Sequence, residues 1–311
     1  MNTIQRTFIL GDQWLYLKLY TGYKTADHFL AEALPGMINQ LKVEQVMDQW
    51  FFIRYLDPHY HLRIRFYLKD PVHSLALSVI NQYIKPYVSQ GLIWKVQADT
   101  YQRELERYGA ETIEHAEAIF NSDSEAIITI LEMFKGNAAE QYLWLIALKM
   151  IDAFLDDFEF DIDDKLELIS HLSGNFKREF GFTTKNYKIQ LDKKFRANRK
   201  TIDEIMTGAS LDNWITPFSA VIQQKSQRIK PVAKTLLKLK TQKTLQVSLN
   251  NLLASYLHMM INRLFRSKQR ICEMVLYDTL ERHYSSFKAK NKYNKEENKI
   301  FADTMQKAVT F

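Results

Sequence analysis

The sequence predicts an α+β fold in which an N-terminal ferredoxin-like βαββαβ sheet packs against a large C-terminal α-helical part. Two observations predict this fold. Strand-like and helix-like patterns alternate up to about residue 101, and apolar residues recur at helical spacing over most of the chain after residue 105. We therefore expect an α+β part over residues 1–108 and a helical part over residues 109–311, packed together as one integrated domain.

The sheet part should contain strands and helices in a fixed order. Residues 14–20 and 61–67 alternate between apolar and polar side chains, which is typical of half-buried strands. Pro35 and Gly36 interrupt the first helical pattern, and Pro71 opens the second. The expected order is strand 14–20, helix 25–41, strand 50–55, strand 61–67, helix 71–88 and strand 92–101.

The rest of the chain predicts helices separated by short polar stretches. The polar run 121–124 resembles a helix cap or break. Residues 181–212 are polar and mixed, which favours a loop region with short helices. The expected helices cover residues 111–134, 137–157, 162–180, 213–240, 246–267 and 270–288.

Composition indicates a soluble, cytoplasmic, helix-rich protein. There are only 9 glycines and 6 prolines, no apolar run long enough to span a membrane and no signal-peptide pattern. The single cysteine, Cys272, excludes a disulfide framework. Residues 185–311 hold 25 lysines and arginines against 10 acidic residues. This basic half is either a solvated helical surface or a surface for a polyanion or an acidic peptide.

In the predicted topology the first and third strands are central neighbours, which gathers cations on one face of the sheet. Lys18 would lie beside Arg63 and Arg65, and adjacent cations are costly unless an anion compensates them. Arg63 and Arg65 are two apart on a strand, so both side chains project the same way and could clamp a carboxylate or phosphate. The alternative is a pair of salt bridges to Asp156 and Asp157.

Two further pairs of residues could carry chemistry. Glu104 and Arg107 are three apart and suit either a site or an ordinary surface ion pair. His258 and Asn262 share a helix face and suit either a buried hydrogen-bonded pair or an acid–base group. His59 and His61 have no third ligand at a suitable spacing, so we expect no metal site. The sequence also has no glycine-rich phosphate loop, so we expect no nucleotide cofactor.

Six short motifs in order resemble the C-terminal, glutamate-elimination domain of lantibiotic dehydratases, a domain also met as a stand-alone thiopeptide-type bacteriocin biosynthesis protein. The resemblance covers essentially the whole chain. It departs from the family at Ala110, where a second glycine is usual, so the turn there should differ. The motifs are Trp14-Leu-Tyr-Leu-Lys-Leu-Tyr, Trp50-Phe-Phe-Ile-Arg-Tyr-Leu-Asp-Pro, His61-Leu-Arg-Ile-Arg-Phe, Thr100-Tyr-x-x-Glu-x-x-Arg-Tyr-Gly, Ala116-Glu-x-x-Phe-x-x-Asp-Ser and His258-Met-x-x-Asn-Arg-Leu.

The resemblance implies a lyase-type β-elimination in one half of a split dehydratase. A separate glutamylation enzyme that uses glutamyl-tRNA would load Ser or Thr of a ribosomal precursor peptide. This chain would then expel glutamate, leaving dehydroalanine or dehydrobutyrine, without a metal or other cofactor. The implied catalytic residues are Arg63, Arg65, Arg107 and His258. The implied substrate-binding or supporting residues are Lys18, Arg54, Glu104, Asn262 and Arg263.

Two other functions stay open at this point. The same fold houses pyridine synthases, which join two dehydroalanines to close a thiopeptide macrocycle. A non-catalytic partner that binds a leader peptide is the third reading, because the basic half suits an acidic peptide. We expect no membrane partner, and a homo-oligomer is compatible with the sequence.

Overall fold

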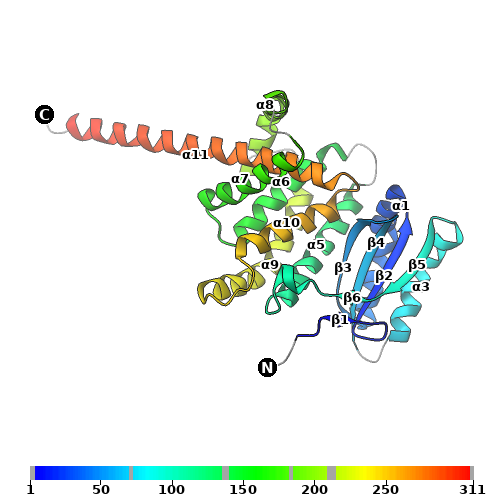
Figure 1. Ribbon diagram of the computed structural model, residues 1–311. Coiled ribbons are helices and arrows are strands. Elements are labelled where there is room, and N and C mark those ends of the chain that lie inside the picture. Colours follow the sequence, from blue (N-terminus) through cyan, green and yellow to red (C-terminus); the bar gives the residue numbers. More distant parts are fainter. Residues whose placement is uncertain (1–3, 70–72, 135–139, 182–184, 209–214, 309–311) are drawn as a thin grey trace. The chain divides into compact units, whose positions relative to one another are not determined.

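The computed structural model describes residues 4–69, 73–134, 140–181, 185–208 and 215–308 (Figure 1). Contacts divide the chain into two compact units. Unit 1 comprises residues 1–158 and 212–272, and unit 2 comprises residues 159–211 and 273–311. The domain boundary expected after residue 108 therefore falls inside unit 1.

Unit 1 is built on a four-stranded antiparallel sheet with the strand order β3-β4-β2-β5. As predicted, β2 and β4, the first and third strands of this sheet, pair at its centre. Their alternating sequences turn leucine, isoleucine and phenylalanine side chains to one face and polar side chains to the other. The strands are β2 (Trp14–Thr21), β3 (Met47–Leu56), β4 (Tyr60–Leu68) and β5 (Ile93–Asp99).

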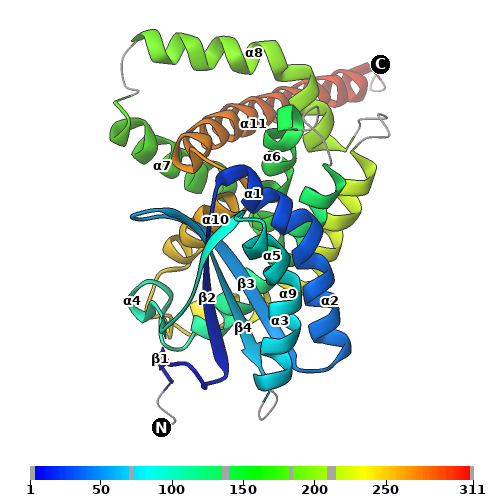
Figure 2. The ribbon, with the colours of Figure 1, turned by 90° about the vertical axis from the view of Figure 1, so that its right-hand side faces the viewer.

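Helices between the strands cover the apolar face, as Figure 2 shows for α2 and α3. The first crossover is continuous from α1 (Tyr23–His28) through a π-helical turn (Phe29–Ala33) into α2 (Leu34–Val43). Pro35 is the second residue of α2, and the π-helical turn ends two residues before it. The second crossover is α3 (His73–Ser89).

The remaining elements of unit 1 follow β5. The short strand β6 (Tyr101–Gln102) pairs with β1 (Thr7–Phe8), so the predicted strand 92–101 ends at Asp99 and the chain continues into a separate two-stranded sheet. Among the described residues, five helices complete the unit. They are α4 (Leu105–Tyr108), α5 (Ile113–Met133), α6 (Glu140–Asp157), α9 (Thr216–Thr241) and α10 (Leu249–Leu264).

Helix α5 runs without interruption through the polar run 121–124, so the expectation of a cap or break there is wrong. These polar side chains instead bond the outer edge of β3. Asn121 accepts a bond from the Trp50 N–H at 3.2 Å, and Ser124 accepts one from the Phe52 N–H at 3.2 Å. The sheet therefore ends at β3 because helices satisfy its outward backbone groups.

Unit 2 contains α7 (Ile162–Glu179), α8 (Lys185–Thr207) and most of α11 (Gln269–Ala308). Asp161 starts α7 with a capping box. The loop expected over residues 181–212 is wrong, because most of it forms α8. Leu191, Phe195 and Ile202 recur at helical spacing along α8 and are buried, and this signal lay within an otherwise charged sequence.

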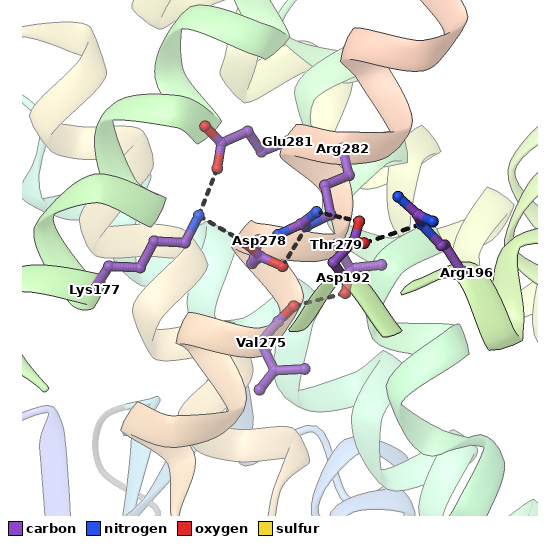
Figure 3. Close-up of polar contacts among 8 residues, drawn as sticks. All are labelled: Lys177, Asp192, Arg196, Val275, Asp278, Thr279, Glu281 and Arg282. Carbon is purple, nitrogen blue, oxygen red and sulfur yellow. Dashed lines mark hydrogen bonds and ion pairs between the residues drawn. The ribbon is translucent and has the colours of Figure 1, made fainter. Parts of the chain in front are cut away.

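Ion pairs link the three helices of unit 2 (Figure 3). Lys177 of α7 contacts Asp278 and Glu281 of α11, with N–O distances of 2.6 and 2.9 Å. Arg282 of α11 contacts Asp278 at 2.8 Å and reaches Asp192 of α8 at 3.1 Å. Because Asp278 is buried, each of its partners compensates a charge that would otherwise be costly.

The predicted combination of a sheet with a large helical part is confirmed. In the part of the chain that the structure describes, no helix has the length and apolar character needed to cross a membrane.

Candidate functional site

The polar face of the sheet in unit 1 lies opposite the face that α2 and α3 cover, and it carries the polar residues of the two central strands. The register sets Lys18 of β2 opposite Arg63 of β4, and Tyr16 opposite Arg65. Arg63 and Arg65 therefore project to the same face, as the alternation predicts.

Arg65 is a buried cation surrounded by aromatic rings. Its side chain lies among the rings of Tyr16, Phe51 and Tyr101, with Cζ 4.3, 5.2 and 4.8 Å from the ring centres. Only 8% of the residue is exposed, and burial lowers the pKa of its guanidinium. Its Nε–H has no hydrogen-bond partner, and no described carboxylate forms an ion pair with it. Aromatic faces compensate only part of a buried charge, so the site favours an anion.

Arg63 is held by a ring and a histidine. Its guanidinium lies 3.3 Å from the centre of the Tyr55 ring, and its Nε–H donates to Nε2 of His61 at 3.1 Å. The other ring nitrogen of His61 lies 2.7 Å from the carbonyl oxygen of His59. Burial lowers the pKa of His61, which favours the neutral ring with its proton on Nδ1. The guanidinium of Arg63 keeps its remaining donors for a ligand.

The predicted alternative, in which Arg63 and Arg65 pair with Asp156 and Asp157, is absent among the described residues. Lys18 differs from the arginines because it forms an ion pair with Asp99. Burial raises the pKa of Asp99, but the bonds from Lys18 and the Thr100 N–H, together with the charges of Lys18 and Arg63, outweigh it, so the net pKa is lowered. The anion-binding capacity of the face therefore lies with the two arginines.

Arg107 connects the end of the sheet to helix α10. It lies on α4, its Nε–H donates to Oγ of Ser255 at 3.1 Å, and its guanidinium is 3.6 Å from the carboxylate of Glu104. Glu104 is also close enough to act on the pKa of Arg65. The ion pair between Glu104 and Arg107 is therefore formed, and it lies next to the polar face.

His258 lies on α10 between two anchored residues. Ser255, His258 and Asn262 share one face of the helix, because they are three and four residues apart. Ser255 is bonded to Arg107, and Asn262 is bonded to the backbone of Arg54. His258 is half-buried between these two contacts. The structure thus brings Arg107 within about one helical turn of His258.

Arg54, Asn262 and Arg263 form a buried network at the outer edge of β3. Asn262 accepts a bond from the Arg54 N–H and donates one to the Arg54 carbonyl, both at 3.0 Å. Arg263 donates to the Phe52 carbonyl at 2.7 Å, and Arg54 donates to the Arg263 carbonyl at 2.9 Å. Both arginine side chains are fully buried and paired with carboxylates, Arg54 with Asp27 and Arg263 with Asp123. These residues join α10 to the sheet.

A second cluster, which the sequence did not predict, contacts Arg65 through the ring of Tyr101. The hydroxyl of Tyr101 donates to Glu117 at 2.8 Å, and Arg103 binds both oxygens of Glu117 at 2.8 and 2.6 Å. Burial raises the pKa of Tyr101 well above its usual value, so the hydroxyl stays protonated. The signal in the sequence was the motif that begins at Ala116, to which no role could be assigned from spacing alone.

The described residues contain no group of three or more histidine, cysteine, aspartate or glutamate residues placed to hold a metal ion. Both ring nitrogens of His61 already have partners. The chemistry that the site offers is therefore binding of an anion by arginines, with a histidine nearby.

Comparison with known sequences confirms the resemblance. The family model described as lantibiotic biosynthesis dehydratase C-term matches residues 14–284. The subtilin biosynthesis protein SpaB of Bacillus subtilis is 28% identical over 54% of this chain and 17% of its own length. The nisin biosynthesis protein NisB of Lactococcus lactis is 35% identical over 40% of this chain and 12% of its own length. The epidermin biosynthesis protein EpiB of Staphylococcus epidermidis is 25% identical over 81% of this chain and 24% of its own length. The chain thus spans less than a quarter of the length of each of these relatives.

Solved structures share the fold. The tRNA-dependent lantibiotic dehydratase MibB from Microbispora superposes with a TM-score of 0.69 and 24% identity, over 88% of this chain and 28% of that one. TsrL superposes with a TM-score of 0.61 and 13% identity, over 88% and 94%. TbtD, a pyridine synthase from thiomuracin biosynthesis, superposes with a TM-score of 0.63 and 11% identity, over 88% and 99%.

Proposed function

Because the chain belongs to the lantibiotic biosynthesis dehydratase C-terminal family, we propose that it performs the glutamate-elimination half of a dehydratase reaction. The substrate is a peptide in which glutamate is esterified to a Ser or Thr side chain. A base removes the Cα proton of that residue, the Cβ–O bond breaks, and its electron pair leaves with the glutamate carboxylate. The product is dehydroalanine or dehydrobutyrine, with free glutamate.

The observation that carries this proposal is the state of Arg65. Its guanidinium is buried among aromatic rings, and no described carboxylate pairs with it. A carboxylate of the glutamyl group would supply the negative charge that this guanidinium lacks. The charge that develops on the departing carboxylate would be stabilised in the same place.

The neighbouring residues have distinct proposed roles. Arg63 binds a second oxygen of the glutamyl group, and its contact with neutral His61 leaves its charge available to a ligand. Arg107 stabilises the enolate-like transition state, and Glu104 orients Arg107. His258 transfers a proton.

Four further residues of the sequence prediction act by support. Lys18 forms an ion pair with Asp99 and adjusts the net charge of the polar face. Arg54 and Arg263 are buried at the β3 edge beside the half-buried Asn262, and the three residues position α10 and therefore His258.

The partners and the setting are also proposals. The chain acts on a ribosomal precursor peptide that has been loaded with glutamate from glutamyl-tRNA, and because charged tRNA is cytoplasmic we propose that the reaction takes place in the cytoplasm. We assign the sheet of unit 1 to the ferredoxin-like type, supported by its strand order and its two helical crossovers.

The test is mass spectrometry of a chemically glutamylated peptide incubated with the purified chain. The wild type should release glutamate and form dehydroamino acids without any other protein. Arg65→Ala and Arg63→Ala should fold and slow this release by about 10²–10³-fold, the usual effect of removing a group that stabilises developing charge. Arg228→Ala, which removes an exposed arginine of α9, is the matched control and should react at the wild-type rate. Full activity in Arg65→Ala would refute the arginine clamp.

A pyridine synthase is the second candidate, because TbtD, described as a pyridine synthase, superposes on 88% of this chain with a TM-score of 0.63. Sequence identity favours elimination, since the dehydratase relatives share 25–35% identity and TbtD shares 11%. The same assay separates the candidates. A cyclase would ignore the glutamylated peptide and act only on one that already carries dehydroalanines, and a pure peptide-binding partner would act on neither.

A further inference from the structure

The two edges of the sheet in unit 1 differ in whether their outward backbone groups have hydrogen-bond partners. At the β3 edge, the outward N–H groups of Trp50, Phe52 and Arg54 all have side-chain acceptors from α5 and α10. The carbonyls of Phe52 and Arg54 also receive donors there. This edge is closed to further strands.

The opposite edge, β5, is open. Beyond its ladder with β2, none of residues 93–98 makes a backbone hydrogen bond to another residue that the structure describes. Trp94 is 56% exposed and Val96 is 42% exposed. An exposed edge strand with apolar side chains is a template for pairing with another extended chain.

The open edge borders the polar face described above. The Trp94 ring lies 5.0 Å from the ring of Tyr20, and Lys95 lies 5.0 Å from the same ring. Val96 pairs with Leu19 and so belongs to the opposite, helix-covered face. The edge therefore offers an apolar contact on each face of an added strand.

The charge of the polar face defines the chemistry of the partner. On the described residues of β2, β4 and β5, the polar face carries four cationic residues and the carboxylate of Asp99, with Glu104 close to Arg65. The four are Lys18, Lys95, Arg63 and Arg65. An added strand would place every second side chain on this face, about 4.8 Å outward from β5. Acidic or glutamylated side chains match these positions, and apolar side chains match the positions beside Val96.

We propose that β5 is a docking strand, on which an extended segment of the peptide substrate pairs by backbone hydrogen bonds with its acidic side chains toward the cationic face. This inference rests on the proposed function, because it takes the occupant to be the substrate. A second copy of this chain fits less well, since pairing β5 with β5 would bring two cationic faces together on one side of the joined sheet.

The test uses a fluorescein-labelled decapeptide of alternating valine and glutamate, with binding followed by fluorescence anisotropy. Trp94→Ala and Val96→Lys should each weaken binding by at least about tenfold, and exchange of the β5 amide hydrogens should slow when the peptide binds. Val43→Lys, at the 70% exposed end of α2, is the matched control and should bind like the wild type. Equal binding by all three variants would overturn the proposal.

Two N-methylated probes test strand pairing on the wild-type protein alone. Probes N-methylated on every valine or on every glutamate each lose the donors of one edge, so one of them should bind at least about tenfold more weakly than the parent. Equal binding of both would exclude strand pairing. A wild type that is dimeric without peptide and becomes monomeric as Val96→Lys would assign the edge to a second copy and overturn the proposal.

Failure of this inference is distinguishable from failure of the proposed function. Glutamate release by the wild type together with a probe that does not bind would remove the docking strand and leave the elimination intact. Binding of the probe at β5 without any glutamate release would support the docking strand and remove the elimination.

Discussion

Replacing Asn262 by alanine tests whether helix α10 is held to the sheet by the bonds at the β3 edge. Asn262→Ala removes the acceptor of the Arg54 N–H and the donor to the Arg54 carbonyl, two bonds of 3.0 Å each. A buried backbone group left without a partner costs about 1–3 kcal/mol. Two such groups predict a loss of about 2–6 kcal/mol in the free energy of unfolding, and water that enters the edge moves the value toward the lower end.

The assay is urea denaturation followed by circular dichroism, with Asn251→Ala as the matched control. Asn251 lies on the same helix with an exposed side chain, so its replacement should change the free energy of unfolding by no more than about 0.5 kcal/mol. The glutamate-release assay, run well below the urea midpoint, should show slower release in Asn262→Ala, because His258 lies one turn away on the same face. Equal stability of the two variants would refute the structural role of Asn262.

Three further predictions concern Tyr101, His61 and the removal of metal ions. Tyr101→Phe should lower the free energy of unfolding by about 1.5–3 kcal/mol, since it removes a bond to a charged carboxylate, whereas Tyr67→Phe, which loses only an exposed bond to Gln13, should change it by less than about 1 kcal/mol. Burial lowers the pKa of His61 below 6.5, so the unfolded chain takes up the proton first as the pH falls. The free energy of unfolding should then decrease from about pH 7 to pH 5 more steeply in the wild type than in His61→Gln, and parallel curves would contradict this. Dialysis against a chelator should leave glutamate release unchanged, and loss of activity that zinc restores would assign a metal to His61 and its neighbourhood.

The sequence was most informative where a local period decides the outcome. Strict alternation at 14–20 and 61–67 predicts strands, and side chains two apart on a strand must share a face. The common orientation of Arg63 and Arg65, and their position beside Lys18, therefore follow from the chain itself once the two strands are paired.

Contacts between residues far apart in sequence were beyond such patterns. The polar run 121–124 looked like a helix break because polar residues inside a helix usually signal one, yet these side chains bond strand β3 about 70 residues earlier. The resemblance implies a supporting role for Asn262, but its bonds to Arg54 could not be inferred from spacing. Helix α8 was missed because its charged residues hide a regular apolar stripe.

The closure of the β3 edge also governs how the chain matures during synthesis. The backbone N–H and carbonyl of Arg54 leave the ribosome long before their partner, because Asn262 follows 208 residues later. At about 5–20 residues per second this interval lasts on the order of 10–40 s. During that time the β3 edge stays partly open, because α5 supplies partners for the N–H groups of Trp50 and Phe52 but the N–H of Arg54 waits for α10. A chaperone that binds exposed strands would therefore act on this protein chiefly before α10 is translated, and a shortened chain that lacks α10 should aggregate rather than persist as a smaller folded unit.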